Sequence, residues 1–127
     1  MLYNSHRGVV MKLKEIMRAL DAEVLVGQDK LEMNIEVAGA SDMISDILLM
    51  AKSGMIILTG LNSPQIIRSA SMLDVKAVIV VRNKTPLPKM IEMAKQYNVV
   101  LLATKYGMYK SCGVLYSQGI KGLEDDA

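Results

Sequence analysis

Helical and strand-like patterns alternate along this chain. The first helical pattern places four apolar residues three, four and seven positions apart, namely Leu13, Ile16, Met17 and Leu20. It predicts a helix that begins near Met11 and ends at Asp21, and a short strand over 23–27 follows. From Asn34 to Ala38 polar and apolar residues alternate, which is typical of a strand with one face in water.

After this strand a helix-then-strand unit recurs. The predicted helices carry the apolar stripes Ile44, Ile47, Leu48 and Ala51, then Ile66, Ala70 and Leu73, then Leu87, Met90, Ile91 and Ala94. Each helix is followed by a wholly apolar strand, and these strands are Met55–Leu58, Ala77–Val81 and Val99–Ala103. A last helix over 106–118, with Met108, Cys112 and Leu115 facing inward, is expected to stop at Gly119.

Continuous apolar strands separated by helices indicate parallel strands that are covered on both faces. The fold class we predict is therefore α/β, with three layers. A mostly parallel sheet of about five strands forms the middle layer, and the alternating strand Asn34–Ala38 is expected at an edge. The crossovers between parallel strands are expected to be right-handed.

Three predicted helices begin at residues that suit a helix N-terminus. Ser41 and Ser63 are expected to cap their helices, and Pro64 occupies the first helical position, where its missing N–H costs nothing. Thr85-Pro86 repeats this pair before the next helix. Gly54 is expected to end the helix that Ser41 begins.

The chain has 127 residues, which is enough for one domain whose core needs no disulfide or metal. We expect a single α/β domain over 11–120. A flexible leader, 1–10, is expected to precede it, and an acidic tail, 121–127, to follow it.

Composition excludes several functions. There is no Phe or Trp, one histidine (His6) and one cysteine (Cys112), so a zinc finger, a redox pair or a disulfide framework is impossible within one chain. The longest uncharged stretch, 53–67, is too short and polar to cross a bilayer, and the leader lacks the apolar core of a signal peptide. We expect a cytoplasmic protein that needs no cofactor.

The net charge of +2 conceals an uneven distribution. Residues 1–46 hold eight acidic and five basic residues, whereas 47–121 hold ten basic residues against Asp74 and Glu92. Such asymmetry suggests an anionic partner, although lysines on helices also serve solubility alone. Weak nucleic-acid binding through 47–121 is one alternative. The scarcity of aromatic residues argues against it, because many proteins that bind nucleic acid stack bases on aromatic side chains.

Polar loops follow the predicted strands, and open α/β sheets bind ligands at the carboxyl ends of their strands. Helix N-termini at these loops favour anions such as phosphate or carboxylate. The candidate ligand-binding residues are Ser41, Asp42, Thr59, Asn62, Ser63, Arg82, Lys84, Thr104, Lys105 and Tyr106. Arg82, Lys84 and Lys105 would supply charge, while Thr59, Ser63 and Thr104 would supply hydroxyl donors. The alternative is that the serines and threonines only cap helices.

No catalytic or metal site is expected from the motifs. The chain has no GxxxxGK[ST] loop, and a catalytic triad would have to recruit His6 from the leader. Asp42 and Asp46 lie four residues apart on one predicted helix face, so a small Mg²⁺-dependent phosphotransfer or hydrolytic enzyme is the alternative. Cys112 is expected to be an inert apolar residue.

Several segments together match a known family, and these are Glu23–Gly27, Gly39–Asp46, the strand into Thr59–Ser63, Ala77–Val81 and Cys112–Ile120, with Ser-Asp-x-x-Ser-Asp as the most specific match. In this order they resemble a stand-alone DRTGG domain over about 11–120. The chain is similar also to the amino-terminal domain of HPr kinase/phosphorylase. It further resembles small HPr-kinase-like proteins of anaerobic bacteria, encoded near iron-hydrogenase and histidine-kinase-like genes.

The chain departs from the name-giving motif of that family. Asn62-Ser63 stands where the family has Asp-Arg, and Arg82-Asn83-Lys84 where it has Thr-Gly-Gly. The resemblance implies a dimeric regulatory α/β domain without catalytic activity of its own. We therefore expect a non-catalytic regulatory, ligand-sensing or protein-interaction domain that forms a homodimer, with a small anionic metabolite or nucleotide as its ligand.

Overall fold

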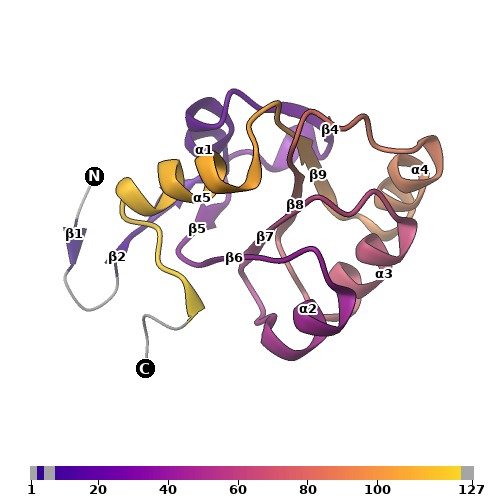
Figure 1. Cartoon of the computed structure of the whole chain (residues 1–127), viewed down its shortest axis with the longest axis horizontal. Helices are drawn as coiled ribbons and strands as arrows, with labels where there is room; N and C mark the ends of the chain where they lie inside the picture. The colour runs from indigo at the N-terminus through magenta and orange to yellow at the C-terminus, as the bar shows by residue number, and fades with distance from the viewer. Residues whose placement is uncertain (1–2, 5–7, 124–127) are drawn as a thin grey trace.

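The computed structural model describes residues 3–4 and 8–123, and the described part folds around one five-stranded sheet (Figure 1). The strands of this sheet, in chain order, are β4 (Glu23–Val26), β6 (Ala38–Ala40), β7 (Ile56–Thr59), β8 (Ala77–Val80) and β9 (Val100–Ala103). The helices are α1 (Leu13–Ala19), α2 (Ile44–Met50), α3 (Pro64–Met72), α4 (Pro88–Tyr97) and α5 (Met108–Ser117). The short strands β1 (Tyr3–Asn4), β2 (Gly8–Val9), β3 (Met11–Lys12) and β5 (Asn34–Ile35) and a 3₁₀ turn, Gln28–Lys30, complete the described elements.

The strand order across the sheet is β4-β9-β8-β7-β6. The last four strands pair in parallel, and β4 joins β9 antiparallel at one edge. Every residue of β7 and β8 is buried, which explains why neither sequence alternates between polar and apolar residues. The predicted fold class, a mostly parallel α/β sheet, is confirmed.

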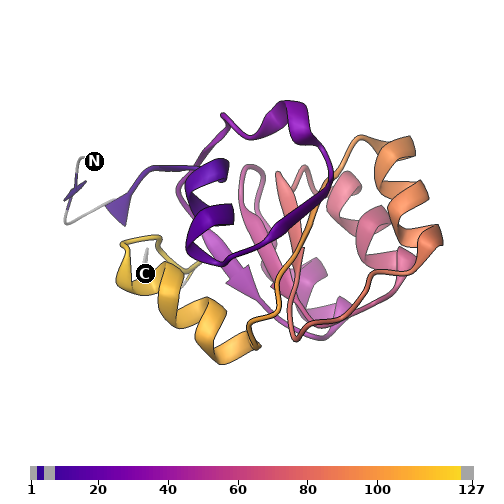
Figure 2. The ribbon, with the colours of Figure 1, turned by 90° about the horizontal axis from the view of Figure 1, so that it is seen from above.

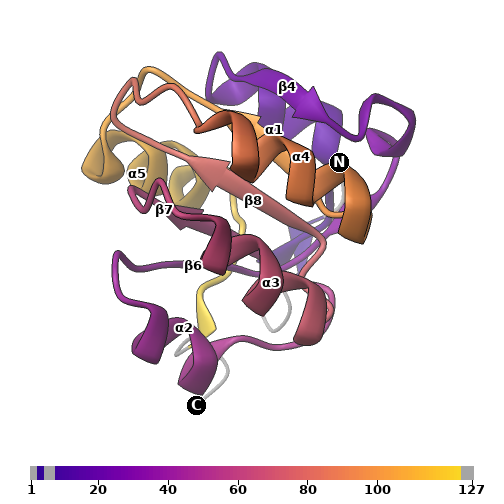
Figure 3. The same cartoon turned by 90° about the vertical axis from the view of Figure 1, so that its right-hand side faces the viewer.

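Helices cover both faces of the sheet, which gives the predicted three layers. Because side chains alternate across a strand, Ile56 and Leu58 of β7 belong to one core, which also contains the inner faces of α1 and α5. Ile57 points the other way, into a second core beneath α2, α3 and α4. Figures 2 and 3 show the two helix layers on opposite sides of the strands.

The strand expected over Asn34–Ala38 is divided in the structure. Its first half, β5, pairs antiparallel with β3 in a separate two-stranded sheet, and the edge strand of the main sheet is β6. The division has a physical reason, because the two halves satisfy their backbone groups with different partners. Asn34 and Ile35 pair with Lys12 and Met11, whereas Val37 O accepts from the N–H of Ile56 (3.1 Å).

The structure confirms one of the predicted N-caps. The Ser63 side chain caps α3 by accepting a hydrogen bond from the N–H of Gln65, with Pro64 in the first turn. Ser41 is not a cap, because α2 begins three residues later, at Ile44, and Met43 occupies the N-cap position. Its hydroxyl instead accepts from the N–H of Met43, just before the helix.

The other corrections concern helix ends. Thr85-Pro86 does not begin α4, because Pro88 takes the first-turn position and Leu87 is the N-cap. α2 ends at Met50, so Gly54 lies in the turn before β7, with a φ of 89°. Gly119 follows α5 with a φ of 100°, as expected for a residue that stops a helix.

The expected leader and tail fall largely outside the described residues, which exclude 1–2, 5–7 and 124–127. Within the leader, Val9 is buried and its N–H donates to Gly119 O (3.0 Å). Among the helices of the described segments, none has the length and apolar character needed to cross a membrane.

Candidate functional site

Loops at the carboxyl ends of the parallel strands lie against one another. The N–H of Arg82, after β8, donates to Tyr106 O (2.8 Å), and the N–H of Asn83 donates to Thr104 O (3.1 Å), so the loops after β8 and β9 are joined. Asn62, after β7, donates from its side-chain amide to Thr85 O (2.9 Å). The ten candidate residues all lie in the loops that follow β6, β7, β8 and β9, except Thr59, which is the last residue of β7.

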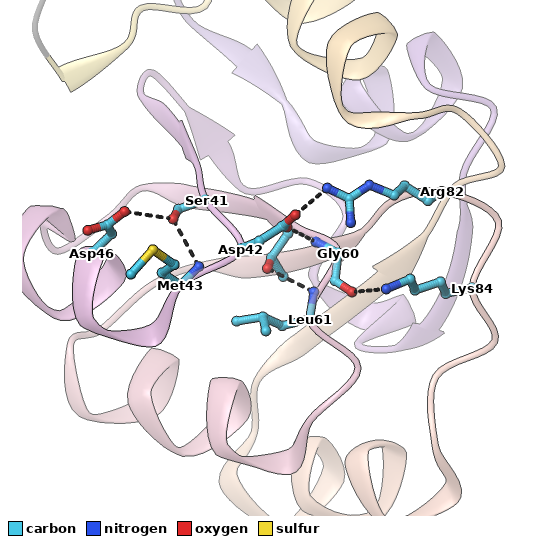
Figure 4. A network of polar contacts seen from close by, with 9 residues as sticks. Ser41, Asp42, Met43, Asp46, Gly60, Leu61, Arg82 and Lys84 are labelled. Atoms are coloured by element: carbon cyan, nitrogen blue, oxygen red, sulfur yellow. Dashed lines mark hydrogen bonds and ion pairs between the residues drawn. The ribbon is translucent and has the colours of Figure 1, made fainter.

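A polar network centres on Gly60, the first residue after β7 (Figure 4). The N–H of Gly60 donates to Asp42 Oδ1 (2.7 Å), and Lys84 Nζ donates to Gly60 O (2.7 Å). The other carboxylate oxygen of Asp42 is paired with the Arg82 guanidinium. Side chains that follow β6 and β8 are thus brought together over the end of β7, the strand between them.

The charge of Asp42 is stabilised by this network. Partial burial opposes ionisation of the carboxyl group, but hydrogen bonds from Arg82 and Gly60 and the charges of Arg82 and Lys84 outweigh it. The pKa of Asp42 is therefore held below its ordinary value. About two-fifths of the Arg82 side chain (42%) and of the Asp42 side chain (38%) remain exposed, so the ion pair lies at the surface of the site.

The absence of a side chain at Gly60 leaves room for the Arg82 guanidinium. A Cβ built on Gly60 would lie 2.8 Å from Arg82 Cζ and 3.1 Å from Asp42 Oδ1. The loop after β8 has an unusual backbone, because Arg82 and Asn83 adopt φ values of 72° and 56°. This left-handed conformation destabilises the backbone by about 1–3 kcal/mol for each non-glycine residue that adopts it.

Two of the predicted hydroxyl donors serve the fold. Thr104 is buried, donates its proton to Leu20 O (2.5 Å) and accepts from the N–H of Tyr106 (3.1 Å). Its proton is committed, so the prediction that Thr104 donates to a ligand does not fit this arrangement. Thr59 is also buried and accepts from the N–H of Leu61 (3.1 Å).

The Asn62 side chain holds two loops together. Its amide group donates to Thr85 O, and its Oδ1 accepts from the N–H of Leu87 (2.9 Å) at the start of α4.

Lys105, a candidate in the loop after β9, is exposed. Tyr106 is half-buried, and Lys110 Nζ lies 3.9 Å from the centre of its ring, a cation–π contact.

The predicted carboxylate pair is not formed on a helix. Asp42 precedes α2, and its two oxygens contact Gly60 and Arg82, whereas Asp46 accepts from the Ser41 hydroxyl (3.3 Å). The two carboxylates therefore face different partners, as Figure 4 shows. Over residues 3–4 and 8–123, no cluster of three or more His, Cys, Asp or Glu side chains has the arrangement of a metal site.

A well-formed groove lies elsewhere on the described part of the chain. This groove, which we call the α5 groove, has a volume of about 570 Å³ and lies between α5, the edge strand β6 and 120–123. None of the ten candidate residues lines it, and its walls are mainly apolar: Ala38, Ala40, Met50, Leu58, Tyr109 and Tyr116. Cys112 also lines it, and burial raises the pKa of its thiol. No sequence motif predicts this groove, because it depends on how α5 sits over the sheet.

A mostly parallel sheet with helices on both faces and polar loops at the strand ends defines an α/β domain. The family model described as "DRTGG domain" matches residues 15–117, and the chain belongs to this family. The predicted resemblance to a DRTGG domain is thereby confirmed, while the similarity to the amino-terminal domain of HPr kinase/phosphorylase stays a prediction.

One solved structure is similar over most of the chain. It contains the CBS and DRTGG domains of the regulatory region of Clostridium perfringens pyrophosphatase, in complex with the activator diadenosine tetraphosphate. The match has a TM-score of 0.66 at 20% sequence identity and covers 91% of this chain but 49% of that one. At this identity the match supports the fold. A search of curated proteins gives no significant match.

Proposed function

We propose that this DRTGG domain is a regulatory domain without catalytic activity of its own, which binds a small anionic metabolite or nucleotide and acts as a homodimer. The binding site is the surface formed by the loops after β6, β7, β8 and β9. The observation that supports this most strongly is that three cationic side chains, Arg82, Lys84 and Lys105, follow two adjacent parallel strands.

The charges at this site favour an anion. Asp42 neutralises one of the three cationic groups through its ion pair with Arg82, so a net positive charge remains. Lys105 is exposed, and Arg82 keeps 42% of its side chain exposed although one edge of its guanidinium is paired. A guanidinium has five N–H donors in a planar fork, so Arg82 can bind a phosphate or carboxylate while it retains Asp42.

The loop backbones are held in place before any ligand arrives. Bonds from Lys84 to Gly60, from Asn62 to Thr85 and from Arg82 N–H to Tyr106 tie the loops into one surface. A site arranged in advance loses less conformational entropy on binding, which favours affinity. The regulatory character is supported by membership of the DRTGG family and by the fold shared with a regulatory region.

A thermal-shift screen of the full chain tests the ligand. The probes are inorganic phosphate, acetyl phosphate, AMP, ATP and diadenosine tetraphosphate. An anion that binds the native state raises the apparent stability, by about 2.7 kcal/mol at a hundredfold excess over Kd. No shift with any of these anions would contradict the proposed ligand class.

A pair of lysine variants locates the site. Lys105→Ala is expected to weaken binding about tenfold, which is about 1.4 kcal/mol, because an exposed cation is lost while the loop contacts remain. Lys95→Ala removes an exposed lysine from the last turn of α4, at the end of the helix away from the proposed site, and is the matched control. Equal affinities of the two variants would place the ligand elsewhere.

A further inference from the structure

Asp42 is the only acidic residue among the ten candidates at the ends of β6, β7, β8 and β9. Its Oδ1 accepts from the N–H of Gly60 (2.7 Å), and its Oδ2 is paired with the Arg82 guanidinium. A carboxylate has about four lone-pair sites on its two oxygens, so about two sites can still accept a hydrogen bond. Because 38% of the Asp42 side chain is exposed, a ligand can reach them.

Four other side-chain oxygens at these strand ends are already engaged with the backbone. Asn62 Oδ1 accepts from an N–H at the start of α4, and the Ser63 hydroxyl accepts from an N–H in the first turn of α3. The hydroxyls of Thr59 and Thr104 are buried, and each accepts from the N–H two residues later. Asp42 therefore offers a ligand an exposed acceptor that these four neutral groups do not.

The charge of Asp42 restricts which ligand group can lie against it. Its pKa is held below the ordinary value, so at neutral pH the carboxylate is ionised and only accepts hydrogen bonds. It repels a phosphate placed directly against it, so the ligand group at this point is a hydrogen-bond donor. The cations Arg82, Lys84 and Lys105 leave the site with a net positive charge, so a neutral hydroxyl group is a better donor here than an ammonium group.

The acceptor and the exposed cation lie at different points along the edge of the sheet. The Asp42 carboxylate lies over the end of β7, as Figure 4 shows, whereas Lys105 follows β9, two strands away. Neighbouring strands are about 4.8 Å apart, so these two points are separated by about 10 Å. A single phosphate ion cannot bridge that distance, whereas a sugar that carries a chain of phosphates can.

We propose that the ligand is a nucleotide whose ribose hydroxyls donate hydrogen bonds to Asp42, while its phosphates bind Lys105 and the unpaired edge of Arg82. This inference rests on the proposed function and specifies its ligand. A hydrogen bond to an ionised carboxylate is stronger than one between neutral groups. Asp42 thereby distinguishes a nucleotide from a plain chain of phosphates, which has no hydroxyl donor to offer.

Isothermal titration calorimetry of the full chain with ATP, 2′,3′-dideoxy-ATP and inorganic triphosphate tests this inference. The two nucleotides differ only in the two ribose hydroxyls. The unmodified chain is expected to bind ATP about tenfold more tightly than 2′,3′-dideoxy-ATP, because a hydrogen bond to a charged group contributes at least that much.

Two aspartate variants assign this preference to one side chain. Asp42→Ala removes the acceptor, so it should bind the two nucleotides with equal affinity and should bind inorganic triphosphate no more weakly than the unmodified chain does. Asp46→Ala removes a neighbouring carboxylate that accepts from Ser41 and is the matched control. It should keep the tenfold preference.

The results that would overturn the inference are distinct from one another. Equal affinity of the unmodified chain for both nucleotides would show that the hydroxyls are not bound, although the anion site stands. A preference that persists in Asp42→Ala would assign the sugar to another residue, and a loss of triphosphate binding in this variant would show that Asp42 only holds the loops. No binding of any of the three compounds would contradict the proposed function together with this inference.

Discussion

The Arg82 guanidinium and the Asp42 carboxylate form an ion pair that crosses the end of β7. The two residues are 40 positions apart in sequence and follow strands that are not neighbours in the sheet. Gly60, at the end of the intervening strand, donates its N–H to the same carboxylate. This relationship fixes how three loops are arranged at the proposed binding surface.

The ion pair makes stability depend on pH. The folded-state pKa of Asp42 is lowered, so its contribution is present above the ordinary aspartate pKa and is lost as the pH falls through the folded-state value. The contribution at neutral pH is expected to be below about 1 kcal/mol, because both side chains are partly exposed. Thermal unfolding of the unmodified chain and of Asp42→Asn should therefore differ at neutral pH and converge in acid. A difference that grows on acidification would show that Asp42 is not stabilised as an anion.

Gly60→Ala is expected to displace the Arg82 guanidinium, since the new methyl group would lie within 2.8 Å of Arg82 Cζ. The end of a flexible arginine moves readily, so the predicted cost is loss of the ion pair, about 1 kcal/mol or less, rather than unfolding. A double-mutant cycle measures this by denaturant unfolding. In an Arg82→Ala background Gly60→Ala should cost less than in the unmodified chain, and equal costs would contradict the proposed clash.

Ser111→Ala is expected to stabilise the fold. The Ser111 hydroxyl is fully buried and has no hydrogen-bond partner among the described residues, and such a group costs about 1–3 kcal/mol. Denaturant unfolding should show a gain of about 1 kcal/mol, since alanine also suits the interior of α5 better. Ser63→Ala is the contrasting variant, because it removes the cap of α3 and should lose about 1 kcal/mol. A loss of stability in Ser111→Ala would mean that the hydroxyl has a partner.

Thr104→Val should destabilise the domain by about 1–3 kcal/mol. The substitution keeps the shape of the side chain but leaves Leu20 O and the N–H of Tyr106 without their hydroxyl partner. Thr104→Ser retains the hydroxyl and should recover most of the loss. A Thr104→Ser variant that is no more stable in denaturant than Thr104→Val would contradict the dominant role of the hydroxyl.

Sequence patterns predicted the elements that local physics determines. The buried strands β7 and β8 come from apolar runs of sequence, and Ser63-Pro64 is a strong helix start, so both predictions were confirmed. The start of α4 was mispredicted because Thr85-Pro86 and Leu87-Pro88 are both possible starts. Asn62, more than twenty residues away, selects the second by binding Thr85 O and the Leu87 N–H.

The sequence predicts where the candidate site lies on the fold, but not which of its residues contact one another. The rule that ligands bind at carboxyl ends of parallel strands located the loops. The pairing of Arg82 with Asp42 and the commitment of Thr104 to Leu20 O depend on tertiary distances that no spacing in the sequence reveals. Gly60 had a sequence signal, since a glycine directly after a buried strand often allows close approach of another group.

The central claim, that the strand-end surface binds an anion, is tested most directly by titrating the ¹⁵N-labelled chain with ATP and following its amide resonances. The account predicts that shifts concentrate at the amides of 60–63, 82–84 and 104–107, and that they weaken in Lys105→Ala. Shifts confined to the α5 groove, or no shift at any ATP concentration that the sample tolerates, would contradict it.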